Sequence, residues 1–412
     1  MAVTNVTNEV ASKVALFGTE LTPGVAVTPT GKLEGTWEAS RSRALVREEK
    51  ATGSYDRMTT IKREAETYSG SYTETPSFES MPSLLRYGVA GGDNPTADAN
   101  DEIAYTRVQT PSSNTDNVDT MTIVSGVEGL PFQATGVRWD EWTLSWSATG
   151  SESAWQFSAN PRMSKFGRLP GSFTGVATAG TTTSITMTGA GMTIDEWVGS
   201  YIYLDYGSHI GEVRLVTDNT ADTISWDGAL GSAPTTGTVF HVVPQLPIVS
   251  PVEHEIIDGD TVDVYVDLWK PDGTAIGSTL VSERIVEFSV TQSLNTAQKR
   301  RAAGIIGRVG RGARWYTGNV RFEFDRWDEY KEWDEDDFVS LRFEKKGSII
   351  DPTAGTTKLL RIDLEKVAWD VFTEDSEEHN MTATLSYVAA NPIGSPNPIF
   401  RATTVNTLAT LP

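Results

Sequence analysis

The stretch Val262-Asp263-Val264-Tyr265-Val266-Asp267-Leu268 decides the fold class, because aliphatic residues alternate along it with acidic or aromatic ones. A period of two places successive side chains on opposite faces of a strand and is typical of a sheet with one buried face. Lys270-Pro271-Asp272-Gly273 follows it with turn chemistry. The pattern recurs in Trp142–Trp146, Val320–Phe324 and Met381–Tyr387. We therefore expect a mainly β protein.

Two stretches have helical spacing instead. In the first, Phe78, Met81, Leu84 and Leu85 are followed by Gly88, with Ser77 as a candidate N-cap; Pro82 restricts this helix to a short segment. In the second, Trp327, Tyr330 and Trp333 recur every third residue within an acidic block. This spacing puts three aromatic rings near one helix face and leaves carboxylates on the other.

The middle of the chain has a composition of its own. Between Gly171 and Gln245, threonine and glycine are frequent and Arg214 is the single basic residue. Short apolar runs separated by Gly or Asn/Asp turns predict a compact all-β unit. We expect a small inserted β domain at 171–246 within a discontinuous β-sandwich or barrel domain formed by 1–170 and 247–412.

Composition excludes several classes of protein. The chain has 412 residues, 38% of them hydrophobic, with twelve Trp and no Cys, which excludes a disulfide framework and any thiolate metal site or nucleophile. No apolar run approaches the roughly 18 residues of a membrane span, and the N-terminus has no signal-peptide pattern, so we expect a protein used in solution. A net charge of −21 argues against wrapping nucleic acid.

Charge is distributed unevenly along the chain. Phe288–Phe322 contains no acidic residue and seven cations, whereas Glu323–Asp337 contains nine acids and two cations. The cations are Lys299, Arg300, Arg301, Arg308, Arg311, Arg314 and Arg321. An acidic body repels its own copies unless a basic surface meets an acidic one, so this sign reversal favours self-assembly.

Catalytic and cofactor signatures are scarce. None of the four histidines is paired at metal-site spacing, and no phosphate loop or nucleophile elbow occurs. Asp334, Glu335, Asp336 and Asp337 could in principle supply the acid and base of a glycoside hydrolase beside Trp327 and Trp333, or they could be the solvated face of a helix. We expect neither an enzyme nor a bound cofactor or metal.

In their order and residue patterns, these elements resemble the major tail tube protein of long, non-contractile-tailed bacteriophages. The resemblance rests on the opening loop Phe17–Thr30, a first strand at Leu33–Trp37, a long hairpin arm from Tyr55 and the short Pro82–Tyr87 helix. Its C-terminal part comprises the Val281–Leu294 strand, the basic connection, Val320–Phe324, the acidic helix, and the strands Val339–Phe343, Leu359–Asp370 and Asn380–Val388.

The resemblance implies a structural virion protein, made in the host cytoplasm, whose subunits form six-membered rings. The rings stack into a tube through which DNA passes without specific binding, and the tape measure, tail terminator and distal tail proteins would be further partners. The inserted domain would then project outward.

Within this scheme, the subunit contact would pair the basic segment with acids of a neighbour. We expect Lys299, Arg300, Arg301, Arg308, Arg311 and Arg314 on one side and Asp334, Glu335, Asp336 and Asp337 on the other. A solvated basic loop is the simpler alternative. The rival function is a bacterial surface or carbohydrate-binding β protein in which Trp residues line a sugar groove.

Overall fold

The computed structural model describes most of the chain. Its described residues are 14–43, 45–50, 58–63, 66–91, 94–97, 103–111, 118–127, 130–148, 154–171, 173–207, 209–244, 254–274, 276–295, 297–300, 306–310, 313–325, 327–377 and 380–411. The fold is mainly β, with antiparallel strands and short helices, as the sequence predicts. Among the described residues, no helix is long and apolar enough to cross a membrane.

The described residues of the first part of the chain hold twelve strands and one helix. The strands are β1 (Val14–Thr19), β2 (Gly31–Leu33), β3 (Thr36–Ser42), β4 (Leu45–Lys50), β5 (Met58–Arg63), β6 (Thr67–Glu74), β7 (Thr96–Ala97), β8 (Tyr105–Gln109), β9 (Met121–Val127), β10 (Leu130–Ser147), β11 (Gln156–Arg162) and β12 (Lys165–Arg168). The helix, α1 (Met81–Arg86), is short and carries Pro82 in its first turn, within one residue of the predicted Pro82–Tyr87 segment at each end. The N-cap of α1 is Ser80, not the predicted Ser77. Ser77 Oγ instead accepts a hydrogen bond from the Ser80 backbone N–H at 2.9 Å, in the turn before the helix.

The last part of the chain repeats this mixture. Its strands are β20 (Asp263–Leu268), β21 (Ile285–Ser293), β22 (Ala297–Arg300), β23 (Ile306–Gly310), β24 (Trp315–Glu323), β25 (Phe338–Asp351), β26 (Thr356–Glu377), β27 (Asn380–Ala389) and β28 (Phe400–Asn406). A 3-10 turn (Ser282–Arg284) precedes β21, and α2 (Asp328–Asp334) follows β24. The predicted acidic helix is therefore confined to the middle of the acidic block.

Hydrogen-bonded pairing links strands from both ends of the chain into one barrel-like system. One run of neighbours is β3–β6–β11–β10–β21–β24–β27–β26. The long strands β10 and β26 contain bulges and also pair with strands outside this run. β10 pairs with β12 and with β9, which leads on to β1 and β2. β26 pairs with β25, which leads on to β20, and with β28, which leads on to β8 and β7. A shared hydrophobic core includes Trp139, Trp142, Phe288 and Phe343.

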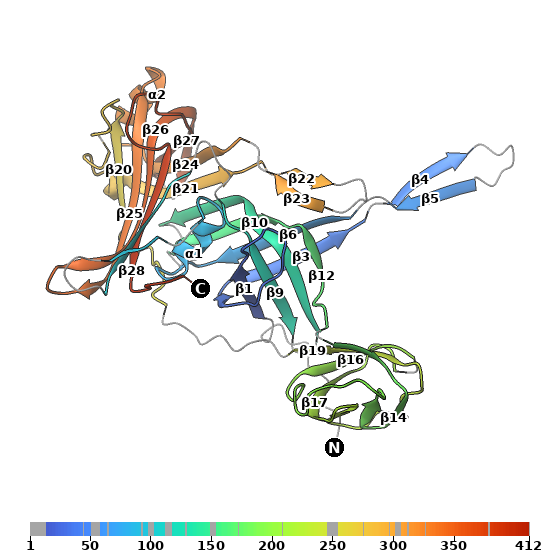
Figure 1. Ribbon diagram of the computed structural model, residues 1–412. Helices are drawn as coiled ribbons and strands as arrows, with labels where there is room; N and C mark the ends of the chain where they lie inside the picture. The colour runs from blue at the N-terminus through green and yellow to red at the C-terminus, as the bar shows by residue number, and fades with distance from the viewer. Residues whose placement is uncertain are drawn as a thin grey trace.

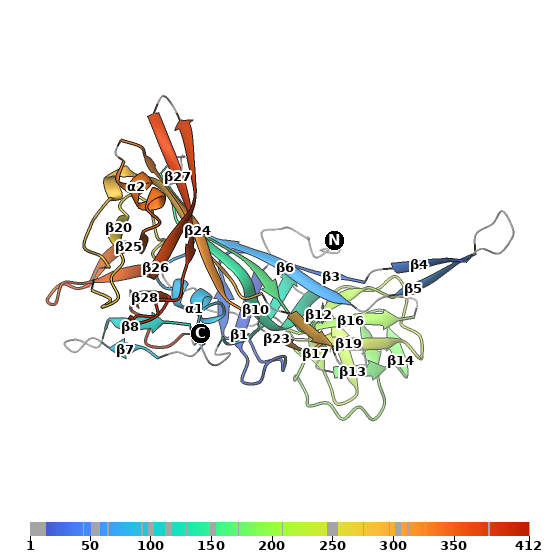
Figure 2. The ribbon, with the colours of Figure 1, turned by 90° about the horizontal axis from the view of Figure 1, so that it is seen from above.

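The predicted hairpin arm is longer than the sequence pattern suggested. It begins at β3, not at Tyr55: β3 pairs with β6 at its base, and β4 pairs with β5 farther out. Figure 1 shows β4 and β5 reaching well away from the body of the molecule, and Figure 2 shows the same arm from above.

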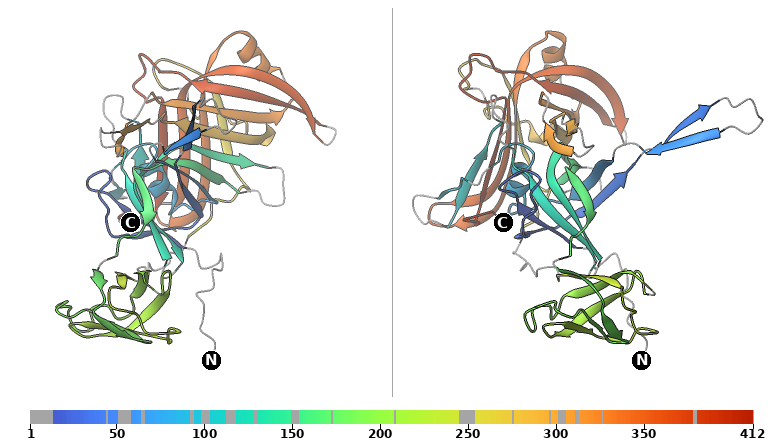
Figure 3. Two further views of the ribbon diagram at one scale, coloured as in Figure 1. Left: turned by 90° about the vertical axis from the view of Figure 1, so that its right-hand side faces the viewer. Right: turned by 45° about the vertical axis from the view of Figure 1, so that its right-hand side comes forward.

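Residues 173–243 form a sheet of their own, in the order β13 (Phe173–Val176), β19 (Val239–Val243), β16 (Tyr201–Tyr206), β17 (Val213–Asn219), β18 (Thr223–Trp226), β15 (Ser184–Thr186) and β14 (Ala179–Thr181). This sheet encloses a separate hydrophobic core that includes Ile224, Trp226 and Phe240. Figure 3 shows the unit at one end of the molecule. Its entry and exit strands pair directly, with Phe173 opposite Val242.

Candidate functional site

The basic segment is a hairpin in the structure. The strands β22 and β23 pair from Ala297 with Gly310 to Arg300 with Ile306, which replaces the expected loop. Lys299, Arg300 and Arg308 lie in these strands, whereas Arg301 and Arg311 lie outside the described residues. At the base, Asn295 has a left-handed backbone with φ of 46°, and its amide donates to the Ala313 carbonyl at 2.9 Å. Arg314 is half-buried just beyond this base.

The acidic helix α2 rests on an aromatic cluster. Tyr330 and Trp333 contact Phe372 of β26, with ring centroids 5.1 and 5.8 Å away, as the one-sided aromatic spacing predicts. Trp327 also touches Tyr330 but keeps 65% of its surface exposed. The helix starts with Asp328 and Glu329, whose charge suits a helix N-terminus. It ends before Asp336, which has a φ of 54°.

Asp334, Glu335, Asp336 and Asp337 are all exposed at the end of α2. Glu335 forms an ion pair with Lys331 at 3.7 Å, one helical turn away. Such exposed pairs contribute at most about 1 kcal/mol. These four acids are therefore a solvated surface within one molecule, and they stay available to a cation from another.

Two acids of α2 that the sequence analysis did not single out are set apart by burial. Glu329 is 8% exposed, and its carboxylate accepts hydrogen bonds from both terminal nitrogens of Arg284, at 2.6 and 3.1 Å. Glu332 is half-buried beside Trp369 Nε1, which donates to it at 3.4 Å. Burial, together with Glu329, Asp328 and Asp337, raises the pKa of Glu332 to about 7. No sequence signal separates it from its neighbours, because the burial depends on β26.

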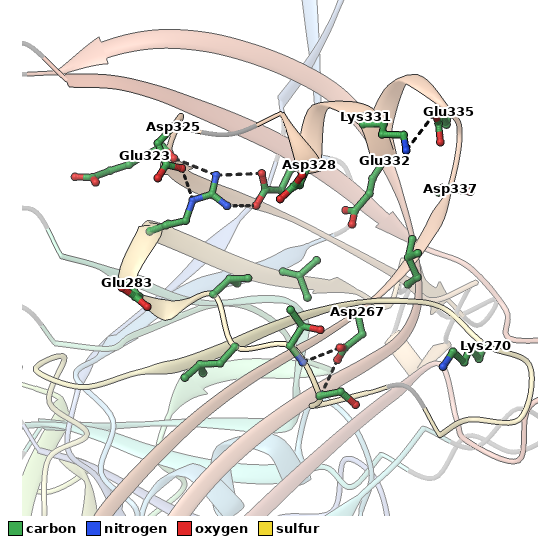
Figure 4. A pocket seen from close by; sticks show the side chains of 18 of the residues that line it. Asp267, Lys270, Glu283, Glu323, Asp325, Asp328, Lys331, Glu332, Glu335 and Asp337 are labelled. Carbon is green, nitrogen blue, oxygen red and sulfur yellow. Dashed lines mark hydrogen bonds and ion pairs between the residues drawn. The ribbon is translucent and has the colours of Figure 1, made fainter.

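An acidic groove of about 850 Å³ lies between α2 and the chain from Val266 to Arg284 (Figure 4). Nine carboxylates line it: Asp267, Glu283, Glu323, Asp325, Asp328, Glu329, Glu332, Glu335 and Asp337. Lys270, Lys331 and Arg284 also line it, and Arg284 is bound to Asp325 as well as to Glu329. Asp334 and Asp336 are not among the lining residues. The groove is suited to attract a cationic segment.

Asp267 holds the wall of this groove that faces α2. Its carboxylate accepts three backbone N–H groups, from Gly277 at 2.8 Å, Ser278 at 3.0 Å and Thr279 at 2.8 Å. The side chain is 6% exposed. The loop 276–281 therefore depends on one buried carboxylate for its shape.

The structure does not bring the basic hairpin and the acidic helix together. Figure 1 shows β22 and β23 well apart from α2. Within one molecule the two predicted halves of the charge contact therefore remain separate.

No protein-family model matches the chain, and no curated protein matches it either. Inference about its function therefore depends on its own residues and their geometry.

Proposed function

We propose that the chain is a structural virion protein that joins copies of itself into stacked six-membered rings, forming the tail tube of a long, non-contractile phage tail. It acts in the virion after assembly in the host cytoplasm. In this proposal it is not an enzyme, and the tape measure, terminator and distal tail proteins are its further partners. DNA leaves through the lumen without specific binding.

The observation that carries the proposal is the projecting arm. Among the described residues, β4 and β5 pair only with each other, from Leu45 with Arg63 to Lys50 with Met58, and they extend beyond the body (Figure 2). A two-stranded hairpin alone in water is marginally stable. A neighbouring subunit that packs against the arm would supply the missing contacts.

Charge supports the same proposal. The basic hairpin and the acidic groove lie on different parts of one chain, as a head-to-tail contact between copies requires. Elsewhere the chain is strongly acidic, with a net charge of −21 overall. An acidic wall repels phosphates over a Debye length of about 8 Å at physiological salt, so DNA would slide instead of binding.

Most Trp residues do not favour the carbohydrate-binding alternative, although Trp315 and Trp327 are exposed. Trp37, Trp139, Trp142, Trp146, Trp155 and Trp226 are buried in the two cores. Within the part of the chain that the structure describes, no Trp lines the acidic groove. The residues that were to stack on sugar rings are mainly core residues.

Negative-stain microscopy of concentrated pure protein tests the function directly. Rings or tubes are expected, whereas a persistent monomer that binds glycans would contradict the proposal.

The charge contact has its own test. Replacing Arg300, Arg301 and Arg308 with Glu should leave a folded monomer that does not assemble. A Lys32→Glu, Lys165→Glu variant, at exposed positions outside the hairpin and the groove, controls for added negative charge. Normal tubes from the triple variant would refute the role of the hairpin.

A further inference from the structure

We infer that the chain is a tandem repeat of one module, and that copies join by pairing β26 of one chain with β3 of the next. The residue pairing between chains would be the same as the pairing of β10 with β21, the contact that joins the two modules within each chain. This step rests on the six-membered ring of the proposed function, but it assigns the six positions to modules instead of whole chains. With two modules per chain, three chains complete each ring, not six.

The two ends of the chain have the same order of elements and the same strand partners. In the first module, β3 and β6 flank the hairpin β4–β5, and α1, β9, β10, β11 and β12 follow. In the second, β21 and β24 flank the hairpin β22–β23, and α2, β25, β26, β27 and β28 follow. The pairs β6–β11 and β24–β27 correspond, as do β10–β11 and β26–β27. So do β9–β10 and β25–β26, β1–β9 and β20–β25, and β10–β12 and β26–β28.

The registers superpose residue by residue. Trp142 lies opposite Ala159, which lies opposite Tyr72; Phe372 lies opposite Leu385, which lies opposite Val320. The same matching equates Val137-Arg138-Trp139-Asp140-Glu141-Trp142-Thr143 with Val367-Ala368-Trp369-Asp370-Val371-Phe372-Thr373. It also equates Tyr68-Ser69-Gly70 with Tyr316-Thr317-Gly318.

Local irregularities recur at the matched positions. The β10–β11 ladder shifts register just after Trp139, and the β26–β27 ladder shifts just after Trp369. Each of these indoles donates a hydrogen bond to the helix of its own module, Trp139 to the Leu84 carbonyl at 2.9 Å and Trp369 to Glu332 at 3.4 Å. Bulges are specific features of a fold, so their recurrence supports one repeated module.

The modules meet at a seam inside the chain, where β10 pairs with β21 from Glu141 opposite Ser293 to Ser147 opposite Glu287. Near its middle, Thr143 and Thr291 face each other with hydroxyl oxygens 2.8 Å apart. Both side chains are half-buried. The seam therefore shows how the end of one module joins the start of the next.

The counterparts of these seam strands lie at the two ends of the sheet run. The counterpart of β10 residues 141–147 is β26 residues 371–377, and the counterpart of β21 is β3. Among the described residues, β3 pairs only with β6, and residues 371–377 pair only with β27. Thr373 and Ser40, which match Thr143 and Thr291, are exposed.

Carrying the seam register across gives a specific contact between chains. Val371 would lie opposite Ser42 of the next chain, Thr373 opposite Ser40, and Glu377 opposite Thr36. The contact is head to tail. Such a contact forms a ring where its rotation closes, and closure pairs both open edges. Neighbouring modules around the ring would then all meet through the same strand pairing. Contacts within a chain would alternate with contacts between chains.

A disulfide tests this register, because the chain has no Cys of its own. The protein carrying Ser40→Cys and Thr373→Cys should cross-link between chains on oxidation. Thr143→Cys with Thr291→Cys is the matched positive control, which should close within one chain. Ser40→Cys with Glu374→Cys is the negative control, since a one-residue slip puts the side chains on opposite faces.

Denaturing, non-reducing gels should show a ladder that ends at three chains, and native mass measurement should show rings of about three times the 44.8 kDa chain mass. A ladder ending at six would overturn the three-chain ring. Tubes without cross-linking would overturn the seam but leave the proposed function standing. Cross-linked rings that never stack into tubes would uphold the seam and count against the tube. A protein that stays monomeric without cross-linking would overturn both.

Discussion

At the scale of single residues, the structure separates acids that the sequence presents as one block. Glu332 sits against Trp369, with Asp328, Glu329 and Asp337 nearby, whereas Asp334 and Asp336 are solvated. Burial raises the pKa of Glu332 from 4.5 to about 7. The folded state therefore keeps a proton that the unfolded chain releases between about pH 4.5 and 7.

The sign of this linkage gives the first prediction. The free energy of unfolding should fall as pH rises through that window, because ionisation costs more in the folded state, and the loss should be complete above pH 7. Glu332→Gln should then be more stable than the parent by about 1 kcal/mol at pH 8 and nearly equal to it at pH 4.5. Urea denaturation at both pH values measures this. The exposed Glu335→Gln on the same helix is the control, and an equal gain from both variants would contradict the assignment.

Asp267 gives a second prediction at this scale. Asp267→Ala would leave the N–H groups of Gly277, Ser278 and Thr279 without their acceptor and should cost about 3 kcal/mol. Asp267→Asn retains one oxygen acceptor and should cost about 1 kcal/mol. Chemical denaturation of the two variants tests the order, and equal losses would show that the carboxylate does not hold the loop.

At the scale of elements, the arm and its base are distinct. Arg41 and Arg43 both form ion pairs with Glu66 where β3 meets β6, and this ladder continues to the Thr36–Thr73 pair. The base is thus closed by contacts within the module. The outer hairpin β4–β5 lengthens the arm beyond this base, and its two strands pair with each other.

Replacing residues 44–65 with a short turn should therefore preserve the fold and abolish tubes. Circular dichroism should show a melting temperature within a few degrees of the parent, and negative-stain images should show no polymers. Tubes of normal appearance would mean that the arm is not an assembly element. Introducing Ser40→Cys and Thr373→Cys into the protein without the arm would show whether rings still form. Cross-linking between chains on oxidation would mean that ring formation survives the loss of the arm.

At the scale of the whole molecule, residues 173–243 lie between the two modules, as a unit with its own sheet and core. The main β domain touches this unit near the connection, where the Arg168 guanidinium lies over the Tyr203 ring at 4.3 Å and 3.5 Å from Asp205. The chain enters and leaves the unit on paired strands, β13 and β19.

Joining Pro170 to Leu246 by a short linker should therefore leave the main β domain folded, because the removed core is separate. Tubes of smaller outer diameter are expected by electron microscopy. An unfolded product would show that residues 171–245 are needed for the main core. Arg168→Glu in the intact chain is a smaller change for comparison. It should remove the contacts of Arg168 with Tyr203 and Asp205 while leaving the unit in place.

The sequence by itself determined the β class, the compositional limits of the middle unit and the position of both helices. These features follow from local periodicity and turn chemistry, which act over a few residues. Val262–Leu268 alternates because one face of its strand is buried, and the spacing of Tyr330 and Trp333 puts both rings on one face of α2. The charge reversal at Phe322 was visible in the same way.

Only the tertiary structure decided which strands are partners, and with them the burial of Glu332, the groove and the two modules. The Val-x-Trp-Asp-x-aromatic-Thr repeat is present in the sequence, at Val137 and Val367, but so short a match has no meaning until the ladders align it. The physical reason is that a period of two says which face of a strand is buried, whereas its neighbours are chosen by packing between residues far apart in the chain.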